Sequence, residues 1–449
     1  MQENEIVELN IEKISNLGLG IARSDGFVIF VEGACPGDKV KAKISKVRKN
    51  FANAKTVEVL KPSKYRVEPF CKMQKVCGAC QLQFIDYDYQ LELKRQIVED
   101  AIHKIGGFDI KIPYPVKSPE IKNYRHKIQY PVSQTKVSKR ILVGYYKPQT
   151  HEIVNIKYCP IQPEICDEII EFIRESAGKF DISGFDEKSH SGDLRHIVIR
   201  SSVSNGNILL TLVINSTKLS DGIKKLANEI FNAFDCVTGV CVNYNPNKTN
   251  VILGQKSECA AGDDFIEEKL LDKKFKIGSN TFFQVNPQSA ENIFSYVKDF
   301  IKNNYKVPLI LDAYAGIATF GICVSDIAQK VVSVEENCES CMRAAESLKI
   351  NNINNLEIHN SDAAEFFKAE KRRFDVSIID PPRKGCTTES LDEVYRLTTG
   401  HIVYVSCNPA TLARDLKYLC EKGCKVESIQ PFDMFCHTYH IENVAVIKV

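Results

Sequence analysis

The last third of the chain has the clearest alternation of hydrophobic and polar positions. Short apolar runs occur in VPLILDAYAG, KVVSVEEN, FDVSIID and HIVYVSC. The stretches that follow them, such as CMRAAESLKI and ATLARDLKYLC, have apolar residues at helical spacing. Repeated units of strand and helix predict a doubly wound, mostly parallel α/β sheet. The chain ends in two strand-like runs with no helix between them, in QPFDMFCHTYHIENVAVIKV, which predicts an antiparallel terminal hairpin.

The first 61 residues have a different pattern, with short alternating strands and frequent turns. The expected strands are EIVELNIEKI, GFVIFVEG, DKVKAKISKV and AKTVEVLK, separated at Gly20, at Gly26 and at the turn Cys35-Pro36-Gly37-Asp38. Short strands at this spacing predict a small barrel.

The middle of the chain has no single dominant period. A helix is expected from Tyr87 to Lys104, followed by strand-rich segments, which together predict a central α+β domain. We therefore expect three domains, with the ranges 1–61, 62–272 and 273–449.

Composition narrows the class of protein further. The chain has 449 residues, 44% of them hydrophobic, which is enough for several cores. We find no apolar run long enough to span a membrane and no leader-like N-terminal segment, so we expect no membrane association. The 17 cysteines are spread along a long chain, which favours reduced thiols and a cytoplasmic location. A monomer without an obligate protein partner is our default expectation.

Charge is balanced over the whole chain but not along it. The 59 basic and 57 acidic residues give a formal net charge of +2. The segment 39–66 is strongly basic, with Glu58 as its one acidic residue and Asp38 just before it, and this favours a nucleic-acid partner over the alternative of a solvated face. Its cations are Lys39, Lys41, Lys43, Lys46, Arg48, Lys49, Lys55, Lys61, Lys64 and Arg66.

Candidate cofactor-binding residues follow the strands of the predicted parallel sheet, where ligands of such sheets bind. Asp312, Tyr314 and Gly316 end the first strand. Glu335 ends the second strand, where a carboxylate can hold ribose hydroxyls. The remaining candidates are Asp362, near the adenine position of the third strand, and Asp380, at the end of the fourth. The alternative for a single acidic residue at a strand end is a helix cap.

Two residues are candidates for catalysis. Cys407 follows the fifth strand and precedes a helix that begins near Asn408 and Pro409. A helix N-terminus lowers a thiol pKa, so we expect a thiolate there, with a buried structural cysteine as the alternative. Glu442 begins the last strand, close to His437 and His440, and is a candidate general base; the alternative is a solubility charge at a strand edge.

Three cysteines are closely spaced in FCKMQKVCGACQLQ. Cys71, Cys77 and Cys80 form a C-x5-C-x2-C pattern, and Cys159 in KYCPIQ is a distant fourth. Four thiolates suit zinc or an iron-sulfur cluster, and the spacing alone does not distinguish them. The alternative is a loop of thiols without metal.

The segment NYRHKIQYPV alternates polar and aromatic residues. Asn123, Arg125, Lys127 and Gln129 would share one face of a strand, and with Tyr124 and Tyr130 they could contact single-stranded RNA. A half-exposed strand without ligand has the same pattern.

Several of these motifs resemble known families. NLGLGIA followed by VEGACPGDKV resembles the TRAM domain, an oligonucleotide-binding (OB-like) barrel. The combination of FFQVNPQSAE, DAYAG, DPPRKG, SCNPATLARDL and DMFxHTxHxE resembles the RNA (uracil-5-)-methyltransferases, whose catalytic domain is a class I S-adenosylmethionine-dependent methyltransferase. One departure is Cys436, where the family commonly has proline, which affects the expected stiffness of the loop before Glu442.

The resemblance implies a function and a set of roles. It implies S-adenosylmethionine binding by Gln284, Tyr314, Glu335 and Asp380, with Cys407 as nucleophile on C6 of uracil and Glu442 as the base that removes the C5 proton. It also implies a four-iron four-sulfur (4Fe-4S) cluster on the cysteines and 23S ribosomal RNA as the substrate. The alternatives are a tRNA uracil-5-methyltransferase, a cytosine-5 enzyme, and an iron-sulfur RNA-binding protein without catalysis.

Overall fold

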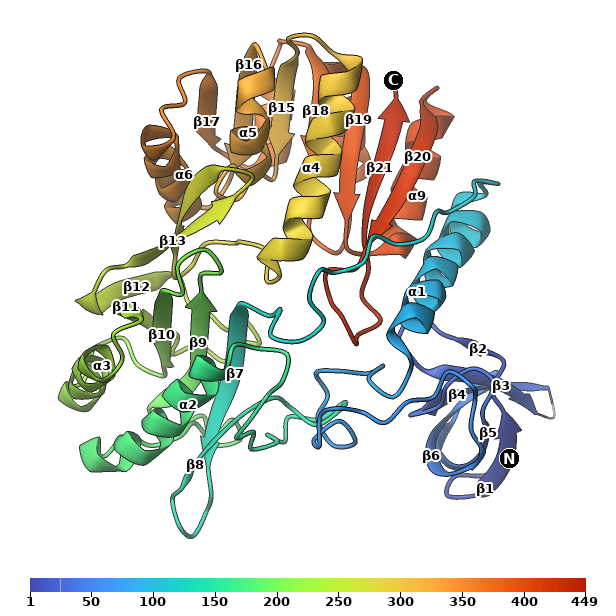
Figure 1. Cartoon of the computed structure of the whole chain (residues 1–449), viewed down its shortest axis with the longest axis vertical. Coiled ribbons are helices and arrows are strands. Elements are labelled where there is room, and N and C mark those ends of the chain that lie inside the picture. Colours follow the sequence, from blue (N-terminus) through green and yellow to red (C-terminus); the bar gives the residue numbers. More distant parts are fainter. Residues whose placement is uncertain (25) are drawn as a thin grey trace.

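The N-terminal segment forms a curled six-stranded sheet. The structure, a computed structural model, describes residues 1–24 and 26–449. The strand order is β1-β5-β6-β4-β3-β2, and the curled sheet lies beside the N-terminal end of α1 (Figure 1). One strand, β3, begins at Gly20, where we expected only a break. A side chain at this position would meet Ile11 and Ala34 at 2.9 and 3.0 Å, so only glycine allows this close packing. The bounds are β1 Ile6–Asn10, β2 Lys13–Ile14, β3 Gly20–Ser24, β4 Phe27–Glu32, β5 Lys39–Val47 and β6 Phe51–Lys61.

The middle region is a mixed sheet covered by two helices. Its order is β12-β11-β10-β9-β7-β8, and the helices α2 and α3 bury apolar residues such as Ile173 and Ile230 in the same core as Leu210 and Leu212. The bounds are β7 Lys127–Gln134, β8 Ile141–Val143, α2 Glu164–Ala177, β9 Leu194–Ser201, β10 Ile208–Ile214, α3 Asp221–Ala233, β11 Val237–Tyr244 and β12 Lys256–Gly262.

The helix expected from Tyr87 is present but packs elsewhere than we assigned it. Helix α1 (Tyr87–Ala101) is capped by Asp86 and continues as one turn of π-helix, Ile102–Gly106. Its apolar residues Val98 and Ile102 share a core with the C-terminal sheet and with Leu412 of α9. In sequence α1 lies in the central range, and in space it covers the C-terminal domain (Figure 1).

The C-terminal domain has the predicted topology. Its seven-stranded sheet has the order β17-β16-β15-β18-β19-β21-β20; the first five strands are parallel, and β21 runs antiparallel to both β19 and β20. The strands are β15 Leu309–Ala313, β16 Lys330–Glu335, β17 Leu356–Asn360, β18 Phe374–Ile379, β19 Thr398–Ser406, β20 Lys425–Phe432 and β21 Glu442–Lys448.

Helices cover both faces of this sheet. Helices α4 and α5 share one core with it, and α1, α7, α8 and α9 share the other. A hairpin of β13 (Phe265–Leu270) and β14 (Lys273–Gly278) precedes α4, so the expected boundary at residue 272 falls in its turn. The helices are α4 Pro287–Asn304, α5 Thr319–Val324, α6 Cys338–Ile350, α7 Ala363–Ala369, α8 Thr388–Leu397 and α9 Pro409–Glu421.

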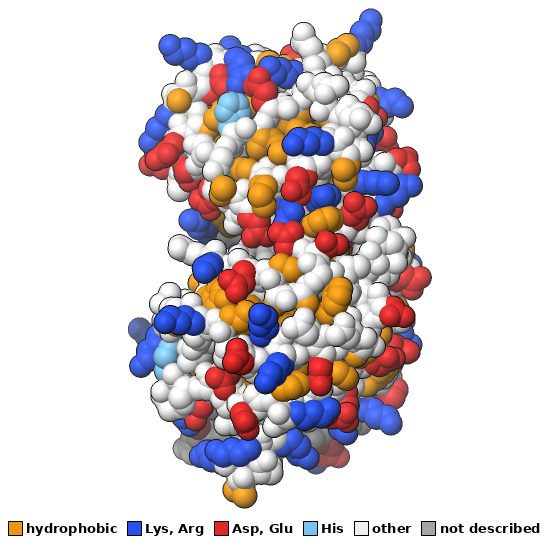
Figure 2. Space-filling model, turned by 90° about the vertical axis from the view of Figure 1, so that its left-hand side faces the viewer, with side chains coloured by type: hydrophobic (Ala, Val, Ile, Leu, Met, Phe, Trp, Pro, Cys, Tyr) orange, Lys and Arg blue, Asp and Glu red, His pale blue; other side chains and the backbone are white. Residues whose placement is uncertain are grey.

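Across the part of the chain that is described, no helix is both long and apolar enough to cross a membrane. On the face shown in Figure 2, basic and acidic side chains are interspersed, as the near-zero net charge leads one to expect.

Candidate active site

The two candidate catalytic residues come from neighbouring antiparallel strands. Ser406, the last residue of β19, is paired with Asn443 of β21. Cys407 follows Ser406 and Glu442 precedes Asn443, so the antiparallel register brings them side by side. The Asn443 side-chain amide donates a hydrogen bond to the Ser406 carbonyl at 3.3 Å, which holds the two strand ends together.

The Cys407 thiol does not have the lowered pKa that we expected. Burial, the negative charge of Glu442 and that of Asp380 raise its pKa to about 11, while Arg383 opposes them. The helix terminus is already satisfied in part, because the Asn408 side chain accepts the Ala410 N–H at 3.1 Å. The expectation of a preformed thiolate was therefore wrong: enclosure and a facing carboxyl outweigh the helix N-terminus.

Glu442 lies inside the protein rather than at a solvated strand edge. Its exposed fraction is 7%. Burial and the charge of Asp380 raise its pKa to about 8, while Arg383 lowers it. The pKa of Asp380 is itself raised to about 7 by burial and by Asp312. The Glu442 carboxylate, once ionised, is therefore a much stronger base than an exposed glutamate.

Arg383 is a member of this cluster that the sequence did not single out. It follows β18 in DPPRKG, and its guanidinium donates a hydrogen bond to His440 Nδ1 at 2.7 Å. Its carbonyl accepts from the side chains of Asn408 and Thr411 at 3.2 and 3.3 Å, which joins this loop to the start of α9. The two adjacent cations Arg383 and Lys384, which follow Asp380 in DPPRKG, were the available signal.

The two histidines near Glu442 differ in location. Burial and Arg383 lower the pKa of His440 to about 4, so it is neutral beside Arg383. His437 points away from the site, and its ring is hydrogen-bonded to the Ile121 carbonyl at 3.0 Å and to Gln90 at 3.3 Å.

The candidate cofactor residues meet at the carboxyl ends of β15 and β16. The turn after β15 has left-handed backbone at Tyr314, Gly316 and Ala318, with φ of 60°, 57° and 57°. The Gly316 N–H donates to Glu335 Oε2 at 2.9 Å, which ties the turn to the end of β16. Non-glycine residues in this conformation are strained, and such strain is concentrated at ligand sites.

Asp312 has a supporting position behind this turn. Its Oδ2 accepts the Gly321 N–H at 2.9 Å and the Ser333 hydroxyl at 3.0 Å. Asp312 is buried, and its hydrogen bonds join the end of β15 to α5 and to β16.

Gln284 and Asp362 lie in two loops that reach this edge of the sheet. Asp362 follows β17, whose last residue Asn360 is paired with Glu335. Gln284 is half-buried, in the loop before α4, and the carbonyl of Phe282 in that loop is 3.9 Å from where a side chain on Gly316 would begin. Asp362 is exposed and caps α7, accepting the N–H groups of Ala364 and Glu365 at 2.8 and 3.2 Å. Asp362 is thus a helix cap, which was the alternative to a cofactor-binding role, and a single carboxylate oxygen, Oδ1, accepts both hydrogen bonds.

All four candidate metal ligands line one pocket. Cys71, Cys77, Cys80 and Cys159 surround it with apolar neighbours such as Ile161. All are free thiols. Within residues 1–24 and 26–449, no group of three or more His, Cys, Asp or Glu side chains is arranged to hold a metal ion. Burial raises the pKa of Cys80 to about 12, so thiolates in this pocket would need a cation.

The suggestion that Tyr124 and Tyr130 could contact single-stranded RNA was wrong. Both rings are buried in the core of the middle region, with exposed fractions of 0% and 1%. The polar residues of the alternation are the ones at least partly exposed, and the regular strand begins only at Lys127. The pattern therefore indicates a half-buried strand whose aromatic side faces inward.

The basic segment 39–66 is partly neutralised by acids from other strands. Lys39 pairs with Glu8 and Lys55 with Glu32, each at 2.9 Å. Lys41 pairs with Glu58 at 3.0 Å within the segment. Counting charges along the sequence therefore overstated the positive potential of this surface, since strand pairing adds carboxylates to it.

The sheet order, the terminal hairpin and the ligand edge define a class I methyltransferase fold with a cysteine and a glutamate enclosed beside the cofactor edge. Residues 86–448 match the family described as tRNA (Uracil-5-)-methyltransferase, and residues 1–57 match the TRAM domain. The chain belongs to the tRNA (uracil-5-)-methyltransferase family, a family of RNA-modifying enzymes, with a TRAM domain at its N-terminus.

Relatives and solved structures agree with this assignment. The chain is 37% identical over 452 residues to an RNA methyltransferase of Clostridium tetani, covering 100% of this chain and 97% of the relative. It is 38% identical over 454 residues to one of Clostridium acetobutylicum, covering 100% and 98%. The crystal structure of Pyrococcus abyssi tRNA (uracil-54, C5)-methyltransferase in complex with S-adenosyl-L-homocysteine is similar, with a TM-score of 0.78, 29% identity and coverage of 98% and 99%.

Proposed function

We propose that this enzyme transfers a methyl group from S-adenosylmethionine to C5 of a uridine in RNA, with Cys407 as nucleophile and Glu442 as base. The observation that supports it most directly is the register that brings these two residues together at the ends of β19 and β21. A thiol and a carboxyl of raised pKa, side by side in an enclosed site, are the two groups that this reaction needs.

The chemistry explains why both groups are needed. C5 of uracil is too weak a nucleophile to accept a methyl group directly. Once the Cys407 thiol has lost its proton, its sulfur adds to C6, and the electron pair of the C5–C6 bond moves to C5 as an enolate. S-adenosylmethionine, when bound, would supply the electrophilic methyl group that C5 accepts, and S-adenosylhomocysteine would leave with the electron pair of the broken sulfur–methyl bond. Ionised Glu442 then removes the C5 proton, the bond between sulfur and C6 breaks, and the thiolate is restored.

Arg383 has a clear part in this scheme. It is the neighbour that lowers the pKa of both Cys407 and Glu442, whereas the two carboxyls raise the pKa of the thiol. Its guanidinium therefore favours the thiolate needed for addition and the carboxylate needed for proton removal.

The residues at the cofactor edge fit S-adenosylmethionine. Glu335 would accept hydrogen bonds from the ribose hydroxyls, and the left-handed turn at Gly316 lets the backbone approach the ligand closely. Tyr314, Gln284 and Asp380 would complete the site, and exposed Asp362 would lie near adenine.

We also propose that the four cysteines hold a 4Fe-4S cluster. The support is that all four cysteines line one pocket. Four thiolates suit a zinc ion or an iron-sulfur cluster, and the family resemblance of the cysteine pattern favours the cluster. Cys71, Cys77, Cys80 and Cys159 would each supply one thiolate.

The proposed substrate is 23S ribosomal RNA, which would place the enzyme in the cytoplasm; transfer RNA is the second candidate. The TRAM domain together with the cysteine set supports the first. The full-length similarity to a solved tRNA (uracil-54, C5)-methyltransferase supports the second.

A methylation assay separates these proposals. Purified enzyme, methyl-labelled S-adenosylmethionine and, separately, 23S RNA or bulk tRNA from cells lacking the enzyme would be incubated and the nucleosides analysed. We expect labelled 5-methyluridine from ribosomal RNA and none with Cys407→Ala. Label in tRNA alone supports the second candidate, label in 5-methylcytidine contradicts the uracil assignment, and no label in either RNA contradicts the proposed activity.

A further inference from the structure

The loop that precedes Glu442 closes on itself. It runs from Asp433 to Ile441 between β20 and β21, and its two flanking residues, Phe432 and Glu442, are paired with each other. Glu442 is therefore the residue at the neck of this loop, which we call the 433–441 loop. The backbone therefore joins the end of the loop, Ile441, directly to Glu442.

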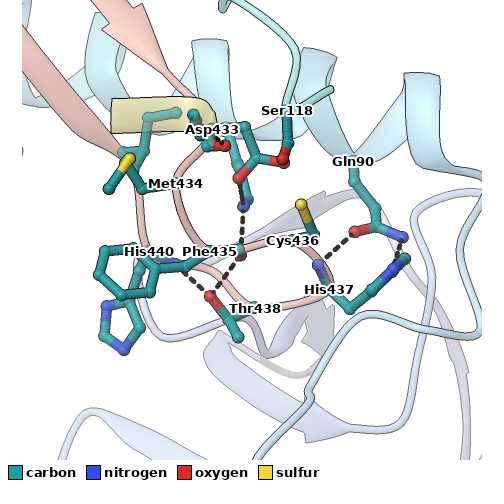
Figure 3. Close-up of polar contacts among 12 residues, drawn as sticks. Gln90, Ser118, Asp433, Met434, Phe435, Cys436, His437, Thr438 and His440 are labelled. Carbon is teal, nitrogen blue, oxygen red and sulfur yellow. Dashed lines mark hydrogen bonds and ion pairs between the residues drawn. The ribbon is translucent and has the colours of Figure 1, made fainter. Parts of the chain in front are cut away.

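Helix α1 holds the base of the loop. Lys94 Nζ and Asp433 Oδ1 form a fully buried ion pair at 2.6 Å, and Lys94 also donates to the Phe435 carbonyl at 3.0 Å. Gln90 accepts the His437 N–H at 3.2 Å, so α1 contacts the loop at three residues (Figure 3).

Two segments connect the cysteine pocket to the same loop, one directly and one through the residues around Tyr124. From the Cys80 side, the N–H of Leu82 donates to the His437 carbonyl at 2.8 Å. From the Cys159 side, the carbonyls of Pro160 and Ile161 accept the N–H groups of residues 123 and 125 at 3.1 and 2.8 Å. One pocket segment is thus hydrogen-bonded to the loop, and the other is hydrogen-bonded to the two residues that flank Tyr124.

Tyr124 makes the second connection to the loop. It lies between the two anchored residues 123 and 125, and its hydroxyl donates to the Cys436 carbonyl at 2.9 Å. The ring is completely buried, and burial raises the Tyr124 pKa well above its usual value, so the hydroxyl remains a donor. Neighbouring Ile121 accepts from the His437 ring, which helps to hold the left-handed backbone of His437, at φ 63°.

We propose that Tyr124 is a positioning residue for Glu442, which joins the four-cysteine pocket to the 433–441 loop so that the pocket sets the place of the carboxyl. This inference rests on the proposed role of Glu442 as base. The proposal assigns a structural role to Tyr124, whose buried ring cannot contact RNA. It also gives the cysteine pocket a task that involves no electron transfer.

The test measures alkylation of Cys407 as a function of pH, which requires neither RNA nor methyl transfer. The Cys407 peptide is followed by mass spectrometry after reaction with iodoacetamide. Glu442 ionises at a pKa of about 8 and Asp380 at a pKa of about 7, and each carboxylate then raises the thiol pKa, Glu442 more than Asp380. The plot of log rate against pH should therefore flatten between about pH 7 and pH 8 in the wild type, with the part near pH 8 due to Glu442. Greater accessibility alone would shift the whole curve and leave this inflection unchanged.

We expect Tyr124→Phe to shrink the inflection, because the carboxyl moves away from the sulfur. Its kcat should fall about tenfold to 100-fold with KM for RNA unchanged. His437→Asn, which keeps the left-handed backbone but removes the Ile121 contact, should act in the same direction and decides the matter if Tyr124→Phe does not fold.

Tyr130→Phe is the matched control. Tyr130 is equally buried, and its hydroxyl donates to Gln162 Oε1 at 2.8 Å rather than to the loop. It should keep the wild-type inflection and kcat. An unchanged inflection in both Tyr124→Phe and His437→Asn, or an equal loss in Tyr130→Phe, overturns the proposal. A wild-type inflection with no methylation of any RNA would contradict the proposed function and leave the geometric coupling supported.

Discussion

Glu442 and Cys407 are electrostatically coupled across the ends of two antiparallel strands. The negative charge of the carboxyl is, after burial, the largest contribution that raises the thiol pKa, to about 11. The carboxyl itself ionises near pH 8, so the two groups cannot both be ionised at neutral pH without a cost. Arg383 reduces that cost and Asp380 increases it, so the protonation state of the pair also depends on these two side chains.

This coupling predicts opposite effects of two substitutions on the reactivity of Cys407. In Glu442→Gln the charge that raises the thiol pKa is gone, so alkylation above pH 8 should be faster and the inflection near pH 8 should disappear. Arg383→Gln removes the group that lowers the thiol pKa, so alkylation should be slower at every pH. Equal rates in both variants and the wild type, measured on the Cys407 peptide, would show that the three side chains do not interact.

The raised pKa of Glu442 also predicts a pH dependence of stability. Below about pH 4.5, the carboxyl is protonated in both the folded and the unfolded chain and costs nothing by ionisation. As pH rises towards 8, the unfolded chain ionises while the folded chain keeps its proton, so the free energy of unfolding falls. Glu442→Gln should therefore raise the melting temperature at pH 8 relative to the wild type and leave the difference small at pH 4.5. A difference independent of pH would contradict the raised pKa.

The two carboxylates near the cofactor edge should differ in what their loss affects. Glu335→Ala removes a charged acceptor and should weaken S-adenosylmethionine binding by about 1.5 to 3 kcal/mol in calorimetry. Asp362→Ala removes a helix cap and should lower the stability by about 1 kcal/mol. Glu335→Gln is the control, because an amide oxygen can still accept the Gly316 N–H. Unchanged affinity in Glu335→Ala would remove this residue from the site.

Metal analysis tests the cysteine pocket. Protein purified without oxygen should be brown and contain iron and acid-labile sulfide in equal amounts, close to four of each per chain for the proposed cluster. Cys80→Ser should lose both, while Cys338→Ser, at an exposed cysteine away from the pocket, should keep them. A colourless protein with one zinc per chain would exclude the iron-sulfur cluster.

The elements that the sequence predicted well are those that have a strong periodic pattern. The buried runs of β15, β16, β18 and β19 fixed the parallel sheet, and the absence of a helix before β21 revealed the antiparallel hairpin. The position of Glu442 followed from that hairpin. Strand β3 was missed because its glycine is needed for close packing against Ile11, a contact that local pattern does not encode.

What the sequence could not provide depended on contacts between distant segments. The thiol pKa of Cys407 depends on residues 380 and 383, which follow β18, and on residue 442, which begins β21. The inward orientation of Tyr124 is set by the core of the middle region, and alternation alone does not say which side of a strand faces inward. The packing of α1 against α9 likewise depends on tertiary contacts, since the amphipathic pattern of a helix does not specify which apolar surface it covers.

The sharpest expectation concerns the order in which bonds form at the uracil ring. The target base must leave its stack so that C6 meets the sulfur and C5 meets the methyl donor. Cys407→Ala should therefore bind RNA but form neither adduct nor product. Glu442→Gln should complete the addition and methyl transfer and then stop, because an amide cannot take the C5 proton. It should accumulate a protein-RNA adduct that already contains the transferred methyl group.

Denaturing gels and mass spectrometry distinguish the possible results of that experiment. Wild-type enzyme with 5-fluorouridine RNA is the positive control, since fluorine at C5 cannot leave as a proton and the same covalent complex is trapped. Release of free methylated RNA by Glu442→Gln at the wild-type rate would exclude Glu442 as the base. An adduct located at a cysteine other than Cys407 would exclude Cys407 as the nucleophile, because only the residue bonded to C6 can remain attached when proton removal is blocked.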